Sequence, residues 1–115
     1  MRRLANALLV AGAATLFVAS AIHSGVIGSF DVFPAAAVPE AVIGGVLAVG
    51  TIVSVVWRSG VVAIVVTAFA IAGTLFGLGF TVPRGEIGDV AYHVGLLATL
   101  IVAAALPVRT RPERT

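Results

Sequence analysis

The chain of 115 residues has no cysteine and no lysine, and only 10% of its residues are charged. Without cysteine there can be no disulfide, no thiolate metal site and no cysteine nucleophile. A soluble domain carries charge on roughly a quarter of its residues, whereas 60% of this chain is hydrophobic. We therefore expect an integral membrane protein, because a bilayer supplies the apolar phase that so short a chain could not build for itself.

Other functional motifs are also missing. No glycine-rich loop follows a strand pattern, and no serine arrangement forms a recognisable catalytic triad, so we expect no enzyme unless a cofactor supplies the chemistry. The pI is about 10.5, but the arginines flank apolar runs and are not clustered with aromatic residues. They predict membrane topology and no nucleic-acid partner. The absence of lysine, with abundant alanine, valine and arginine, favours a prokaryotic source.

Four apolar runs dominate the chain, and each exceeds the lower limit of about 17 residues for a spanning helix. Proline suits the first turn of a helix, so Pro39 is expected to begin the second run, with Glu40 behind it, and Pro107 to close the fourth. Short connections favour an all-α, up-down-up-down, four-helix integral membrane bundle as a single domain over 1–108, followed by a disordered tail over 109–115. The predicted spans cover about 4–22, 39–57, 61–82 and 89–106.

The first apolar run has a second interpretation. Arg2-Arg3, the apolar core and Ala19-Ser20-Ala21 also fit a signal peptide with a small-residue cleavage site. The run is long for a signal core, and three more spans follow it, so we expect it to be retained. Both interpretations leave the later segments in the same orientation.

The distribution of arginine predicts the orientation. Only Arg84 falls at the ends of the spans opposite to the other six arginines. The positive-inside rule then places both termini in the cytoplasm, which gives an N-in/C-in protein of the plasma membrane. The arginines on the predicted cytoplasmic side are Arg2, Arg3, Arg58, Arg109, Arg111 and Arg114.

The remaining ionisable residues collect in the predicted outer half. Asp89 and His93 are four residues apart and therefore share one helix face. By helical rise His93 is the deepest of these groups, roughly two turns below the outer surface. Ionisable groups inside a span tend to face a bundle interior or a wet cavity and mark functional sites. The candidate ligand-binding residues are His93, Asp89, Glu40 and His23, with Tyr92 and Arg84 at the rim.

Several ligands fit this set of side chains. Two imidazoles and two carboxylates suit a divalent transition metal. Two histidines on separate helices could instead be the axial ligands of haem b, although their predicted depths differ. The same side chains are also compatible with a small polar ligand or with a proton relay through His93 and Glu40. Against all of these, Glu40 and Asp89 could be helix caps, and His23 a solvated loop residue.

Glycines within the predicted spans indicate an alternative to ligand binding. Gly73-Thr-Leu-Phe-Gly77 has the spacing that lets a second helix approach closely, and Gly44 and Gly45 lie in the second span. These residues predict either packing inside one bundle or a face for a homodimer or a larger membrane complex. In the latter case the chain is a structural or accessory subunit with no ligand of its own.

Overall fold

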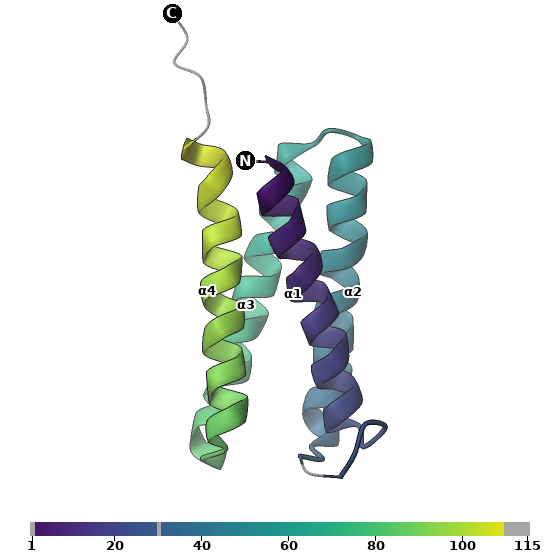
Figure 1. The fold of residues 1–115 in the computed structure, drawn as a ribbon, viewed down its shortest axis with the longest axis vertical. Helices are drawn as coiled ribbons and strands as arrows, with labels where there is room; N and C mark the ends of the chain where they lie inside the picture. The colour runs from purple at the N-terminus through teal and green to yellow at the C-terminus, as the bar shows by residue number, and fades with distance from the viewer. Residues whose placement is uncertain (1, 30, 110–115) are drawn as a thin grey trace, which may run out of the picture.

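The structure, a computed structural model, describes residues 2–29 and 31–109, with side chains through residue 106. Within these residues it is entirely helical, with no strand, so the all-α prediction is confirmed. Successive helices run in opposite directions, and each packs against two neighbours to close a ring (Figure 1). All four are long and apolar enough to cross a membrane. They are α1 (Arg2–His23), α2 (Pro34–Val56), α3 (Gly60–Arg84) and α4 (Ile87–Arg109).

The second helix begins five residues earlier than predicted, at Pro34 and not at Pro39. Proline is favoured in the first turn, and Pro34 occupies that place, so Pro39 lies inside the helix. The added turn is held against α1, where the Ser20 hydroxyl donates to the Ala37 carbonyl at 2.6 Å. Glu40 is consequently not at the helix start, and its side chain is buried in the bundle.

The fourth helix also differs from its predicted bounds, because it runs through Pro107 to Arg109. The missing N–H of a proline one turn from a helix end removes a single backbone hydrogen bond. Arg109, the first residue of the predicted tail, is therefore helical. The rest of that tail, residues 110–115, lies outside the described residues.

Two short turns connect α2 to α3 and α3 to α4. Ser59 caps α3 by accepting a hydrogen bond from the Val62 N–H at 3.3 Å. At the other end Gly85 takes the left-handed conformation, with φ of 72°, which a residue without a Cβ adopts readily. Because α4 begins two residues later, Arg84 at the end of α3 lies beside the first turn of α4.

The centre of the bundle is apolar and free of charge over the described residues. Leu47 and Leu100 are fully buried. Three buried threonines of α3 satisfy their hydroxyl groups on their own helix: Thr67, Thr74 and Thr81 each donate to the carbonyl four residues earlier. The remaining buried apolar side chains of the central cluster are Leu9, Ala13, Leu16, Val66, Ala70, Leu96 and Ala103.

Three of the four singled-out glycines are used inside the bundle. A Cβ at Gly44 would lie 3.2 Å from the Leu16 Cβ, and one at Gly73 would lie 2.5 Å from the Ile43 Cδ1. At Gly77 the neighbour is the His93 ring, with Nε2 at 3.1 Å. Gly45 alone of the four has nothing within 4 Å. The predicted glycine spacing therefore serves packing between α2 and its neighbours and between α3 and α4.

Candidate metal centre

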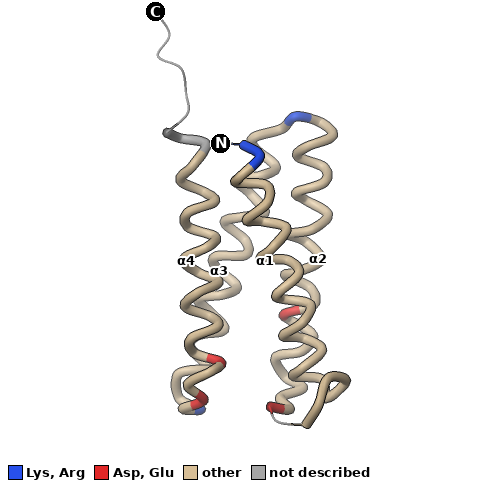
Figure 2. Tube along the Cα trace, in the orientation of Figure 1, with Lys and Arg blue, Asp and Glu red and all other residues tan. Residues whose placement is uncertain are grey.

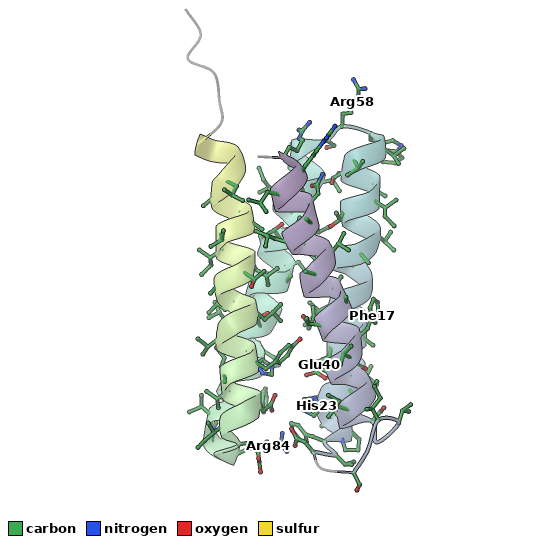
Figure 3. The ribbon with its side chains drawn as sticks, viewed as in Figure 1. Phe17, His23, Glu40, Arg58 and Arg84 are labelled. Atoms are coloured by element: carbon green, nitrogen blue, oxygen red, sulfur yellow. The ribbon has the colours of Figure 1, made fainter. Side chains whose placement is uncertain are left out.

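Charge is divided between the two ends of the bundle (Figure 2). Arginine lies at the end that holds the N-terminus and the α2–α3 turn, whereas the acidic residues gather at or near the opposite end with one arginine. His23, Glu40 and Arg84 lie there, far from Arg58 (Figure 3). The cluster, which we call the acidic cap, is formed by His23, Asp31, Glu40, Arg84, Asp89 and His93.

His23 is the centre of the acidic cap. It is the last residue of α1 and only 3% exposed. Its Nδ1 lies 2.7 Å from the Glu40 Oε2, and its Nε2 lies 3.1 Å from the Asp31 Oδ2. The Asp89 Oδ1 is 3.7 Å from the same Nε2. The expectation of a solvated loop histidine is therefore wrong.

The loop after α1 folds back over the end of the helix and brings Asp31 to His23. Gly25 and Gly28 take positive φ values of 83° and 70°, which permit the reversal. The Phe33 N–H then donates to the His23 carbonyl at 2.8 Å. The Phe33 ring stands edge-on to the imidazole, with 6.2 Å between centroids.

Both ring nitrogens of His23 face carboxylates, which has a chemical consequence. An ionised carboxylate only accepts hydrogen bonds, so each contact needs a hydrogen on the nitrogen or on the carboxyl group. A metal ion can take the place of that hydrogen, because metal ligands bind in their deprotonated form. Nε2 is the nitrogen that two carboxylates, Asp31 and Asp89, approach together.

Arg84 bridges the same two carboxylates from α3. Its Nη2 lies 2.9 Å from the Asp31 Oδ1, and its Nη1 lies 3.3 Å from the Asp89 Oδ2. The guanidinium carbon stands 3.9 Å above the centre of the Phe33 ring, a cation–π contact. Arg84 was predicted at the rim and is 26% exposed, yet it is a bonded member of the cluster.

The acidic cap holds more carboxyl groups than permanent cations. Asp31, Glu40 and Asp89 supply three carboxylates, and Arg84 supplies the one permanent cation. Burial raises the pKa of Asp31, but hydrogen bonds from Arg84 and His23 outweigh it, so this pKa lies below its ordinary value of 3.8. A buried excess of negative charge is costly unless a cation compensates it.

Three of these side chains have the geometry of a metal site. His23, Asp31 and Asp89 each offer one ligand atom, and the three atoms lie within 4.8 Å of one another. They come from the end of α1, the α1–α2 loop and the first turn of α4. Glu40 lies outside this group, because it contacts the other ring nitrogen of His23, and its Oε1 is buried with no hydrogen-bond partner among the described residues.

His93 lies beside this group and not at its centre. Its Nδ1 lies 2.8 Å from the Asp89 backbone carbonyl and 3.2 Å from the Asp89 Oδ1. A carbonyl only accepts, so Nδ1 carries a hydrogen. The other ring nitrogen, Nε2, packs over Gly77, where an added Cβ would lie 3.1 Å from it and the ring would have to shift by a few tenths of an ångström. Asp89 therefore orients the His93 ring through its backbone carbonyl and its carboxylate.

Tyr92 is turned away from the predicted rim. Its hydroxyl is buried without a hydrogen-bond partner among the described residues. The ring stands edge-on to His93 at 5.2 Å and lines a groove between α1 and α4 with Thr15 and Thr99. Among the described residues the Tyr92 hydroxyl therefore makes no hydrogen bond to a carboxylate of the acidic cap.

The sequence reasoning missed Asp31 and Phe33. Asp31 is one of the ionisable residues of the predicted outer half, but it is not among the predicted ligand-binding residues. The signal was available: the loop leaves α1 at His23 and must return to α2 at the same end of the bundle. Any acidic residue near its end therefore lies within reach of His23.

The geometry does not favour haem. The Asp89 carboxylate contacts both imidazoles, at 3.7 Å from His23 Nε2 and 3.2 Å from His93 Nδ1. A haem iron with two axial histidines needs the plane of the macrocycle between them. Here a protein carboxylate takes that space.

Comparisons with known proteins assign no family. No family model matches the chain, and neither a curated protein nor a solved structure matches it. The class is therefore defined by the chain itself: four helices apolar enough to cross a membrane, with a buried His/Asp/Asp group that could hold a metal ion.

Proposed function

We propose that the chain is a small polytopic protein of the plasma membrane whose acidic cap binds one divalent transition metal ion. The observation that carries the proposal is the convergence of His23, Asp31 and Asp89, whose ligand atoms lie within 4.8 Å of one another. Imidazole with carboxylates is a donor set suited to zinc, iron, manganese or nickel. An added divalent charge would offset the excess of carboxylates over guanidinium.

The membrane location is supported by the outer surface of the bundle. Large apolar side chains are exposed along the helices, among them Ile64, Phe76 and Val49, at 67%, 71% and 61%. Water would make so continuous an apolar surface unstable, whereas lipid would not. Among the described residues the charged positions lie at or near the ends of the bundle, apart from one acidic position that lies further in (Figure 2).

The positive-inside rule supports cytoplasmic termini and an acidic cap on the outer side. Arg84, the one exception, is paired with two carboxylates in the fold, so it is not a free topological charge. Reporter fusions test this orientation: fused to residue 115, a fluorescent protein should be bright and alkaline phosphatase inactive. The reverse pattern would place the acidic cap in the cytoplasm.

Metal binding is tested on protein purified in mild detergent, stripped with a chelator and titrated with Zn²⁺ and Ni²⁺. We expect the wild type to bind one ion per chain. Asp89→Asn replaces a carboxylate that would bind the metal ion directly, so we expect it to lower the metal affinity about 100-fold or more. Glu86→Gln is the matched control, because Glu86 makes the same charge change three residues away on an exposed side chain. Equal affinity in wild type and Asp89→Asn would refute the site.

A structural or accessory subunit is the second candidate. It is favoured by one observation: Arg84 pairs with Asp31 and Asp89, and His23 with Glu40, within the chain itself. On this alternative the acidic cap only ties the four helices together. A stripped protein that takes up no metal, and that unfolds when Asp89 is replaced, would favour it.

A further inference from the structure

The geometry points to Arg84 as a cation of the protein itself that competes with the metal ion for the carboxylates of Asp31 and Asp89. This competition would make metal binding readily reversible. This inference rests on the proposed function. In the described structure Arg84 already neutralises part of the acidic cap by its two ion pairs. A site that carries its own counter-charge is stable when empty, unlike a site of bare carboxylates.

The oxygen atoms are divided between the two cations. Arg84 contacts the Asp31 Oδ1 and the Asp89 Oδ2, at 2.9 Å and 3.3 Å. The other oxygen of each carboxylate faces the His23 Nε2, at 3.1 Å and 3.7 Å. A metal ion on the His23 side would therefore share both carboxylates with the guanidinium.

This arrangement has two opposed effects on metal affinity. Arg84 holds the carboxylates in place, and loss of such a positioning partner usually weakens binding about 10- to 100-fold. It also repels the metal ion: at roughly 6 Å and a dielectric constant of about 20, a unit charge weakens the binding of a divalent ion by about 10,000-fold. The side chain is 26% exposed, so solvent screens part of this repulsion. The repulsion remains the larger effect.

The Phe33 ring supports the same assignment. It lies under the guanidinium at 3.9 Å and contacts the His23 ring edge-on. The ring thus holds Arg84 in the position where its charge acts on the site. The Phe33 side chain offers no ligand atom. Its replacement therefore weakens the contact that positions Arg84 and leaves the metal-ligand residues unchanged.

The test compares Zn²⁺ affinity in the stripped wild type, Arg84→Gln and Arg3→Gln, the last being a control at the opposite end. We expect Arg84→Gln to bind Zn²⁺ about tenfold tighter or more, and its thermal midpoint to be lower without metal and restored with it. Arg3→Gln should match wild type. Weaker or equal affinity in Arg84→Gln overturns the inference and leaves the metal site standing.

Two further outcomes separate this inference from the proposed function. If Arg84→Gln binds Zn²⁺ and wild type does not, the competition is supported and resident metal binding by the natural chain is refuted. If neither protein binds, both fail. If Arg84→Gln does not fold, the Phe33→Leu variant provides the test instead. We expect its Zn²⁺ affinity to rise about 2- to 5-fold, which corresponds to the loss of one exposed cation–π contact. An unchanged or lower affinity in that variant overturns the competition.

Discussion

The two ends of the bundle use charge in different ways. At the arginine-rich end Arg2, Arg3 and Arg58 are exposed, and none forms an ion pair among the described residues. At the acidic cap His23, Glu40 and Asp89 are at most 7% exposed, and each has a charged or titratable partner. Exposed charge in water contributes little to stability and can direct topology, whereas buried charge must be compensated. Burial of the charged side chains, and not their number, therefore distinguishes a candidate site from an end of the bundle whose charges only direct membrane topology.

The largest difference is expected between Asp89→Ala and Arg3→Gln. Removing Asp89 takes one of its two carboxylate partners from the Arg84 guanidinium, which keeps Asp31, and His93 keeps its bond to the backbone carbonyl of residue 89. The loss of the hydrogen bonds to this buried carboxylate costs about 2–3 kcal/mol. Arg3→Gln changes an exposed residue and should stay within about 0.5 kcal/mol of wild type. Thermal or denaturant unfolding of the stripped proteins in one detergent measures both. Similar losses at the two ends would contradict the comparison.

A pair of glycines on α3 gives the next largest effect. A Cβ at Gly77 would lie 3.1 Å from the His93 Nε2, so Gly77→Ala should displace the ring and cost about 1–2 kcal/mol. A Cβ at Gly79 meets nothing within 4 Å, so Gly79→Ala should gain up to about 1 kcal/mol of helix propensity. The free energies of unfolding of the two variants should therefore change in opposite directions. If both variants gain stability, His93 is not packed as described.

Asp31 gives the smallest effect, and it depends on pH. Its pKa is below the ordinary 3.8 because the contacts with Arg84 and His23 outweigh burial. A depressed pKa adds stability that is fully present above the unfolded value and is lost as pH falls through the folded value. Asp31→Asn should therefore be less stable at pH about 7, by about 1 kcal/mol. The difference should shrink below about pH 3.8, as measured by thermal midpoints of the stripped proteins. A constant difference down to acid pH would contradict this cause.

Most residues of the candidate site could be predicted from their positions in the sequence. Helical rise placed His23, Glu40, Asp89 and His93 in one half of the bundle, and the structure brings them together at one end. Depth along the helix does not identify the centre of the group: His93 is the deepest by the predicted spans, whereas His23 has carboxylates on both ring nitrogens. Depth along a helix is set by sequence position, whereas the direction in which a ring faces depends on helix rotation.

Glu40 shows where a local rule gave the wrong element boundary. Proline followed by glutamate matches a helix start, and Pro39-Glu40 fits that rule as well as Pro34 does. The choice was made by tertiary contacts: Ala37 packs against α1, and Ser20 bonds its carbonyl. The extra turn carries Glu40 inside the bundle, where it contacts His23 and not the solvent.

The sequence by itself determined four apolar helices, the asymmetry of arginine and the half of the bundle that holds the acidic residues. These properties follow from hydropathy and from 1.5 Å of rise per residue, which are local. Only the tertiary structure decided that Asp31 joins His23, that Arg84 bridges two carboxylates and that Gly77 leaves room for an imidazole. Contacts of about 3 Å depend on the rotation of each helix and on the path of a loop. Hydropathy and length leave both of these free, and packing of the whole bundle fixes them.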